Sequence, residues 1–239
     1  VLEEREILSE DERWTAYLSD VRDYHERTLR EGKGVNPAAR PEGFQEWYKT
    51  NVYHQRQDDY GVATITLPLG DLSAWQMREL AELARRFAGE NVRTTVEQNV
   101  VLRWVSQSDL PDLYQELERV GLNEPGAGSI IDVTACPGTD TCKLGIASSL
   151  GLAGEIRTRL AGKILEMDQA VRNLRIKISG CFNSCGQHHI ADLGFYGVSR
   201  TINGYSVPHF QVVLGGQWKA NAGSFGLASG AIPSKRIPE

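Results

Sequence analysis

The chain has 239 residues, of which 41% are hydrophobic and 24% are charged, which is typical of a globular protein with a buried core. Its net charge of −5 gives no global indication of binding to nucleic acid or to an anionic membrane, and no apolar run reaches the roughly 18 residues that a membrane span needs. The acidic start VLEEREILSEDE does not resemble a secretory signal peptide, so we expect a cytoplasmic protein without nucleic-acid or membrane partners.

The negative charge belongs to the first part of the chain. Residues 1–31 carry ten acidic and five basic side chains, whereas the remaining 208 residues carry 21 of each sign. Residues 11–31 are predicted to form an amphipathic helix, because apolar residues recur there at roughly helical spacing. Glycine and proline then predict a loop over 32–43. The first residue is Val1 rather than Met, so we expect a fragment or a processed chain.

Strands and helices alternate over the next part of the chain. Residues 60–70 are predicted to form a strand, and 71–89 a helix that begins at Asp71 or Ser73 and ends at Gly89. Four residues give this helix one apolar face: Leu80, Leu83, Ala84 and Phe87.

A second strand, broken near 97–99, is predicted over 91–105, and a second helix over 108–122. This alternation indicates an α+β fold, in which the helices lie on one face of a sheet.

The second half of the chain carries all four cysteines at predicted strand ends. We expect a helix over 142–164, beginning at or beside Cys142. The strands are expected over 127–138, 174–180, 188–200 and 205–216.

The cysteines form two pairs, ACPGTDTC and GCFNSCGQHH, with the spacings Cys136-x5-Cys142 and Cys181-x3-Cys185 and 38 residues between the pairs. Loop ends present thiolates together with free backbone N–H groups, which is what an iron–sulfur cluster needs. Structural zinc usually takes shorter spacings of about two to four residues between ligands, and a redox pair of the C-x-x-C type is absent. A zinc site, disulfides and unrelated buried thiols remain the alternatives.

The segments TACPGTDTCKLG and KISGCFNSCGQHHIADLGFYG resemble the signature of the sirohaem- and [4Fe–4S]-containing, ferredoxin-type nitrite and sulfite reductases. Upstream, YHQRQDDYGVATITLPLGDL and VRTTVEQNVVL resemble the ferredoxin-like half-domain of that family, with its R-x-T-x-x-Q element at Arg93, Thr95 and Gln98. The resemblance covers roughly 44–239 and places the chain in the C-terminal half of such a protein.

This resemblance implies a six-electron reduction of nitrite to ammonium, or of sulfite to sulfide, with electrons from ferredoxin or a similar donor. It implies that Cys136, Cys142, Cys181 and Cys185 ligate the [4Fe–4S] cluster. The thiolate of Cys185 would also ligate the sirohaem iron. Binding the anionic cofactor and substrate calls for polar side chains and closely approaching backbone. The candidates are Arg93, Gln98, Lys143, Asn183 and Gly180, with Gly138, Gly145 and Gly186 as further positions of close approach.

His188 and His189 follow a tight turn, and we expect hydrogen bonding rather than catalysis from them. The resemblance divides the chain into an N-terminal helix and linker (1–43), a ferredoxin-like half-domain (44–125) and a cluster- and sirohaem-binding domain (126–239), shortened at its C-terminus. The N-terminal half of the same protein, which supplies most substrate-gripping residues in the family, would be a missing partner. The alternatives are a complete small enzyme, a non-catalytic electron-transfer or cofactor-binding iron–sulfur module, and a zinc-stabilised structural domain.

Overall fold

The computed structural model of the chain describes residues 30–34, 40–89, 91–218 and 223–239. The helix predicted over 11–31 lies outside the described residues, apart from its last two positions, which are not helical. Within the described ranges, no helix is both long enough and apolar enough to cross a lipid bilayer.

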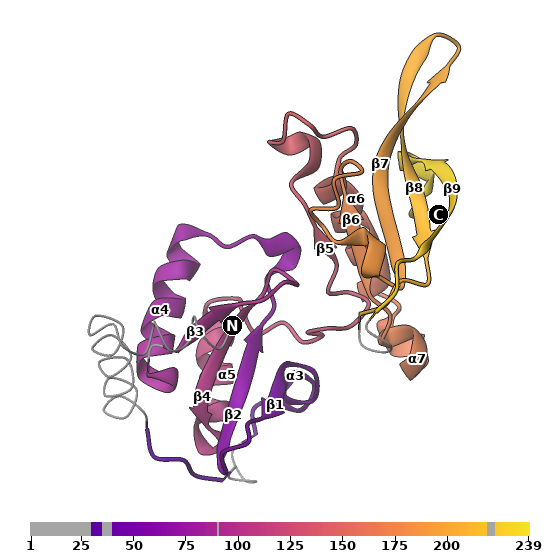
Figure 1. Cartoon of the computed structure of the whole chain (residues 1–239). Coiled ribbons are helices and arrows are strands. Elements are labelled where there is room, and N and C mark those ends of the chain that lie inside the picture. The colour runs from indigo at the N-terminus through magenta and orange to yellow at the C-terminus, as the bar shows by residue number, and fades with distance from the viewer. Residues whose placement is uncertain (1–29, 35–39, 90, 219–222) are drawn as a thin grey trace, which may run out of the picture.

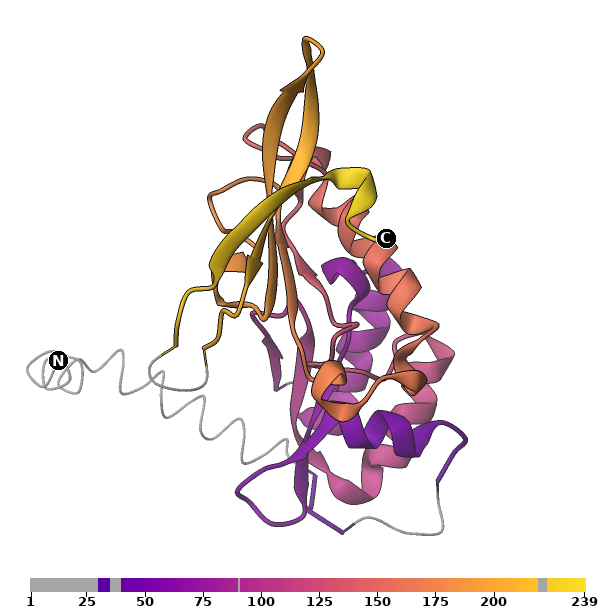
Figure 2. The ribbon, with the colours of Figure 1, turned by 90° about the vertical axis from the view of Figure 1, so that its right-hand side faces the viewer.

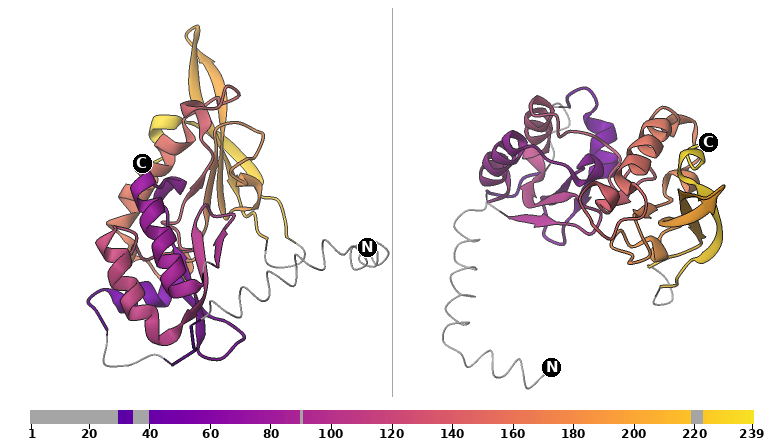
Figure 3. Two further views of the ribbon diagram at one scale, coloured as in Figure 1. Left: turned by 90° about the vertical axis from the view of Figure 1, so that its left-hand side faces the viewer. Right: turned by 90° about the horizontal axis from the view of Figure 1, so that it is seen from above.

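The first part of the structure is a four-stranded antiparallel sheet in the order β1-β2-β4-β3, with α4 and α5 against one face (Figures 1 and 3). The strands are β1 (Val52–His54), β2 (Tyr60–Ile65), β3 (Val92–Thr94) and β4 (Val100–Ser106). The helices are α3 (Phe44–Asn51), α4 (Ala74–Ala88) and α5 (Leu110–Arg119). A single core is shared by α3, the sheet and both covering helices, from Phe44 to Leu122.

Local signals predict α4 correctly. The hydroxyl of Ser73 accepts a hydrogen bond from the Gln76 N–H, the Gln76 side chain accepts one from the Ser73 N–H, and Gly89 closes the helix at φ 52°. The four residues of the predicted apolar face are all buried. The predicted break near 97–99 is also confirmed, because a turn there separates β3 from β4.

The strand predicted over 60–70 is too long, because β2 ends at Ile65. A short 3-10 turn, η1 (Pro68–Gly70), follows it. Pro68 has no N–H for a ladder, and Leu69 and Gly70 adopt φ values of 60° and 71°, which lie outside the extended region.

The second part is a five-stranded sheet in the order β5-β6-β7-β8-β9. Its strands are β5 (Thr134–Ala135), β6 (Ile176–Ser179), β7 (Leu193–Ile202), β8 (Tyr205–Leu214) and β9 (Leu227–Pro233). The strands β5, β6 and β7 are parallel, whereas β7, β8 and β9 are antiparallel. The β7–β8 hairpin projects from the rest of the sheet (Figures 1 and 2). A second core forms where α6 (Ser149–Ala161) packs on β5 and β6; α7 (Gln169–Arg172) precedes β6.

The helix predicted to begin beside Cys142 begins seven residues later, at Ser149. The intervening residues form a loop, because the N–H groups of Ile146 and Ala147 both donate to the carbonyl of Gly180 instead of to a preceding turn. Ser148 then caps the helix by accepting from the Gly151 N–H.

Three further differences concern the second sheet. The strand predicted over 127–138 is only two residues long, and turns precede it. The strand predicted from residue 188 starts at Leu193, after the 3-10 turn η5 (His188–Ile190). The edge strand β9 and the helix α7 were not predicted, and neither were α3 and β1 in the first part of the structure.

The two sheets meet where the β3–β4 turn approaches β5. The side-chain amide of Gln98 donates to the carbonyl of Ala135 at 2.8 Å and accepts from its N–H at 3.0 Å. Beside it, the amide of Asn99 donates to the carboxylate of Asp132 at 2.9 Å. The fold therefore brings the predicted R-x-T-x-x-Q element directly to the strand that leads into Cys136.

Candidate metal centre

Both cysteine loops leave the carboxyl ends of neighbouring parallel strands. Strand β5 leads directly into Cys136, and β6 leads through Gly180 into Cys181. The carboxyl ends of parallel strands meet at one edge of a sheet, and this edge is where α/β folds bind ligands. The topology alone therefore brings the two sequence pairs to the same place.

Backbone contacts lock the two loops together. The N–H of Cys136 donates to the carbonyl of Ile178 at 3.1 Å, and the N–H of Gly180 donates to the sulfur of Cys136 at 3.1 Å. A methyl group on Gly180 would stand 2.5 Å from the Cα of Gly138 and 2.9 Å from the carbonyl oxygen of Ala147. Only glycine permits this approach of two backbones.

The amino end of α6 lies against Cys136. The hydroxyl of Ser149 donates to the Cys136 carbonyl at 2.6 Å and stands 3.4 Å from its sulfur. The exposed N–H groups and the dipole at a helix amino end stabilise an anionic thiolate. Together with the Gly180 N–H, this arrangement supplies the kind of donors that surround the sulfurs of an iron–sulfur cluster.

The four thiols differ in exposure. Cys136 and Cys181 are buried, whereas Cys142 and Cys185 are exposed. Among the described residues, no three His, Cys, Asp or Glu side chains are gathered closely enough to hold one metal ion. The structure thus brings the two loop backbones together but does not gather the four sulfurs into one ligand set.

The other predicted site residues divide into two groups. Gly180 and Gln98 lie next to the first cysteine loop: the N–H of Gly180 donates to the sulfur of Cys136, and the amide of Gln98 donates to the carbonyl of Ala135. Arg93, Lys143 and Asn183 are exposed, and the guanidinium of Arg93 donates to the carbonyl of Val92.

The side chain of Gln98 binds the backbone of the strand that leads into the first cysteine loop. The residue has φ 66°, and its amide pairs with both polar backbone groups of the buried Ala135. Replacement of Gln98 by Leu leaves both groups without a partner, so we expect the free energy of unfolding in urea to fall by about 2 kcal/mol or more. The exposed Gln57→Leu variant should unfold like the parent, and equal losses in the two variants would contradict this assignment.

His188 is fully buried and held in place, as expected from its position after a turn. Its Nδ1 lies 2.8 Å from the hydroxyl of Ser179, and its ring stacks on Tyr196 with the centroids 4.7 Å apart. The hydroxyl of Ser179 also accepts from the N–H of Gly186 at 3.1 Å, so Ser179 joins His188 to the second cysteine loop. Burial, and to a smaller extent the neighbouring His189, lowers the pKa of His188 from 6.5 to about 4.

This shift predicts a loss of stability in acid. Between pH 6.5 and about 4, His188 is protonated in the unfolded chain but not in the folded chain. The free energy of unfolding therefore falls as the pH falls through that range. Between pH 7 and pH 4.5 the contribution amounts to about 2 to 3 kcal/mol. Urea unfolding of a His188→Gln variant should show a correspondingly flatter pH dependence than the parent. Parallel curves for the parent and His188→Gln would contradict the prediction.

Several side chains that contact the cysteine loops were not singled out from the sequence. Lys177, Ser179 and Gln187 surround the second cysteine loop, and Ser149 supports the first. The lysine within the apolar run of β6 was the one available signal, because charged side chains are rarely buried without a reason.

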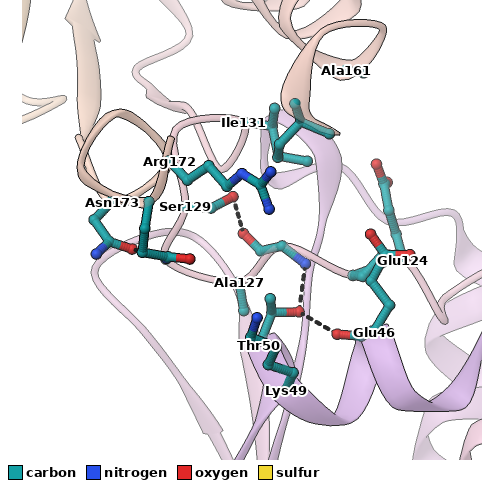
Figure 4. A pocket seen from close by; sticks show the side chains of 15 residues that line it. Glu46, Lys49, Thr50, Glu124, Ala127, Ser129, Ile131, Ala161, Arg172 and Asn173 are labelled. Carbon is teal, nitrogen blue, oxygen red and sulfur yellow. Dashed lines mark hydrogen bonds between the residues drawn. The ribbon is translucent and has the colours of Figure 1, made fainter. Parts of the chain in front are cut away.

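A pocket of about 420 Å³ lies at the opposite end of the parallel strands. Residues that precede β5 and β6, including Ser129 and Arg172, line it together with Glu46 and Thr50 of α3 (Figure 4). The N–H of Gly126 in its wall already donates to the hydroxyl of Thr50 at 2.8 Å. The pocket therefore stands apart from the cysteine loops.

Comparison with known proteins identifies the family. Residues 53–120 match the nitrite/sulfite reductase ferredoxin-like half domain, and residues 126–234 match the nitrite and sulphite reductase 4Fe-4S domain. A ferredoxin–nitrite reductase of Synechococcus elongatus is 29% identical over 80% of this chain and 37% of the relative. A sulfite reductase [ferredoxin] 2 of Mycolicibacterium paratuberculosis is 30% identical over 84% of this chain and 36% of the relative.

Among solved structures, the Mycobacterium tuberculosis NirA protein superposes with a TM-score of 0.67 at 27% identity, over 79% of this chain and 35% of that chain. The chain thus spans little more than a third of the length of these relatives. Two consecutive domain matches, the relatives and the shared fold agree with one another. The chain belongs to the nitrite and sulfite reductase family, and this membership implies a [4Fe–4S] cluster and sirohaem as its cofactors.

Proposed function

We propose that this chain supplies the cluster-binding half of an enzyme that reduces nitrite to ammonium, or sulfite to sulfide, by six electrons at a coupled sirohaem–[4Fe–4S] centre. The observation that carries the proposal is the convergence of both cysteine loops at the carboxyl ends of β5 and β6. The names of the relatives, ferredoxin-dependent nitrite and sulfite reductases, support the substrate class and ferredoxin as the electron donor.

The four thiolates have one role in common in this proposal, and one of them has a second role. Cys136, Cys142, Cys181 and Cys185 bind the cluster, and the thiolate of Cys185 is shared with the sirohaem iron. When bound, the two cofactors supply the electron transfer and the binding of the anion at iron. Binding of one cluster requires the exposed side chains of Cys142 and Cys185 to turn toward the two buried thiols.

The remaining contribution of the chain is positioning and charge. The N–H of Gly180 and the amino end of α6 stabilise the thiolate of Cys136. Gln98 fixes the backbone one residue before it. The exposed side chains of Arg93, Lys143 and Asn183 are proposed to contact the cofactor carboxylates or the anion, for which their charge and amide groups are suited.

We further propose that residues 44–125 and 126–239 act as the ferredoxin-like half-domain and the cofactor-binding domain. The two separate hydrophobic cores support this division. The rest of the longer polypeptide would supply most of the substrate pocket. Large apolar side chains beside the exposed cysteines support a covered surface here: Leu144 and Phe182 are each 67% exposed.

The test is turnover of nitrite and of sulfite by the full-length protein that contains this chain, with reduced ferredoxin as the donor. We expect ammonium or sulfide as the product, at a rate that depends on all four cysteines. A full-length protein that carries both cofactors but reduces neither anion would overturn the proposal.

A further inference from the structure

A lysine is buried inside the sheet between the two cysteine loops. Lys177 lies at the centre of β6 and is 2% exposed. Its neighbours Ile176 and Ile178 belong to the second core under α6. Because side chains alternate along a strand, Lys177 faces the other side of the sheet, where Thr134 and η5 lie.

The ammonium of Lys177 contacts both cysteine loops at once. Its Nζ donates to the hydroxyl of Thr134 at 3.4 Å and to the side-chain oxygen of Gln187 at 3.2 Å. Thr134 stands two residues before Cys136, and Gln187 stands two residues after Cys185.

Both partners of this cation are neutral. Burial lowers the pKa of Lys177; the charges of Glu97 and Asp132 oppose this shift, and the charge of Arg175 adds to it. Neither carboxylate forms an ion pair with Lys177 in the described part of the chain; Glu97 pairs with Arg175 at 3.6 Å, and Asp132 accepts from the Asn99 amide and the Gly128 N–H. A buried cation without a direct counter-ion costs folding free energy, and an anionic group bound beside it compensates for this cost.

We propose that Lys177 is a positioning residue of the metal centre, which ties the strand before Cys136 to the turn after Cys185 and holds a positive charge beside the bound cluster. The inference rests on the proposed function, because the cluster is the anion concerned. A reduced cluster carries one more negative charge than an oxidised one. A nearby fixed cation therefore stabilises the reduced form and raises the reduction potential.

Two variants test the role of the Lys177 side chain. Lys177→Met keeps the length of the side chain but removes the donor and the charge, whereas Lys177→Arg keeps both. Lys163→Met, at an exposed position beyond α6, removes the same charge where solvent screens it. Thr134→Val is a milder change that removes one hydrogen-bond partner of the ammonium. It replaces Lys177→Met in the test if the Lys177→Met protein does not fold.

The first measurement is a redox titration of the chain reconstituted with iron and sulfide. It is monitored by EPR and gives the midpoint potential of the cluster. We expect a more negative potential in Lys177→Met, a potential near the parent's in Lys177→Arg, and no change in Lys163→Met. A folded Lys177→Met protein with the parent's potential would overturn the proposal.

The second measurement needs no cluster. In the metal-free chain, alkylation of the buried Cys136 and Cys181 reports local opening of the loops. Loss of the ammonium contacts should accelerate it about threefold to tenfold in Lys177→Met, and to a smaller degree in Thr134→Val. If the parent binds no cluster, the proposed function fails, and the alkylation rates alone then test whether Lys177 holds the two loops together. Alkylation rates in Lys177→Met equal to the parent's would show that it does not.

Discussion

Replacement of Cys185 by Ser is expected to abolish the magnetic coupling between sirohaem and cluster and to lower the turnover of nitrite or sulfite by at least about a hundredfold. The reason is that Cys185 is the thiolate proposed to serve both cofactors, so its loss breaks the electron path and removes a cluster ligand. Substitution of residues that only support a metal ligand already lowers metal affinity or activity by about 10- to 100-fold. Loss of a ligand that two cofactors share should lower activity by at least the upper value.

The measurement is a comparison of the EPR spectrum and the steady-state rate of the full-length holoprotein with those of its Cys185→Ser variant. Ser184→Ala is the matched control, because it changes the adjacent side chain of the same turn. The backbone carbonyl of Ser184 accepts from the Gln187 N–H, and the substitution keeps this carbonyl. A Cys185→Ser protein that reduces either anion at the parent's rate would show that the role assigned to Cys185 is wrong.

The second large effect is expected from a single methyl group. Gly180→Ala places a Cβ 2.5 Å from the Cα of Gly138, where two backbones meet and neither can move aside like a flexible side chain. Overpacking of this kind typically costs about 1 to 3 kcal/mol, and a contact with backbone on both sides belongs at the upper end. The same displacement would separate the two cysteine loops, so the variant should also fail to take up iron and sulfide.

Urea unfolding and iron content check this prediction together. Gly162→Ala is the matched control: nothing lies within 4 Å of the place that its methyl group would occupy, and its φ of −71° suits any residue. The control should be as stable as the parent or slightly more stable, because alanine restricts the unfolded chain. Equal stability of Gly180→Ala and Gly162→Ala would contradict the account of how the loops are joined.

The features that could be predicted from the sequence are those with local causes. The cap at Ser73 and the stop at Gly89 lie within the segment that they delimit, so the limits of α4 followed from residues 71–89. The second cysteine pair could be placed at a strand end because the short strand β6 is followed directly by Gly180.

The features that could not be predicted depend on contacts between distant segments. The loop from Cys142 to Ser148 has a composition compatible with a helix, and only its bonds to the carbonyl of Gly180 keep it out of one. Gln98 was identified through a motif as a cofactor ligand, whereas its position against Ala135 arises from the packing of the two sheets. Lys177 was visible as a charged residue within a buried strand, but the alternation that predicts a strand does not reveal that its side chain lies against the other cysteine loop.

The most direct test of the central claim, that the two loops form one iron–sulfur site, is a metal and sulfide analysis of the chain after anaerobic reconstitution, read together with its visible spectrum. We predict about four iron atoms and about four sulfides per chain, with the broad absorption near 400 nm of a [4Fe–4S] cluster. Addition of sirohaem should then give a Soret band and a cluster signal that is coupled to the haem. A colourless chain that binds one zinc ion and no sulfide would contradict the account.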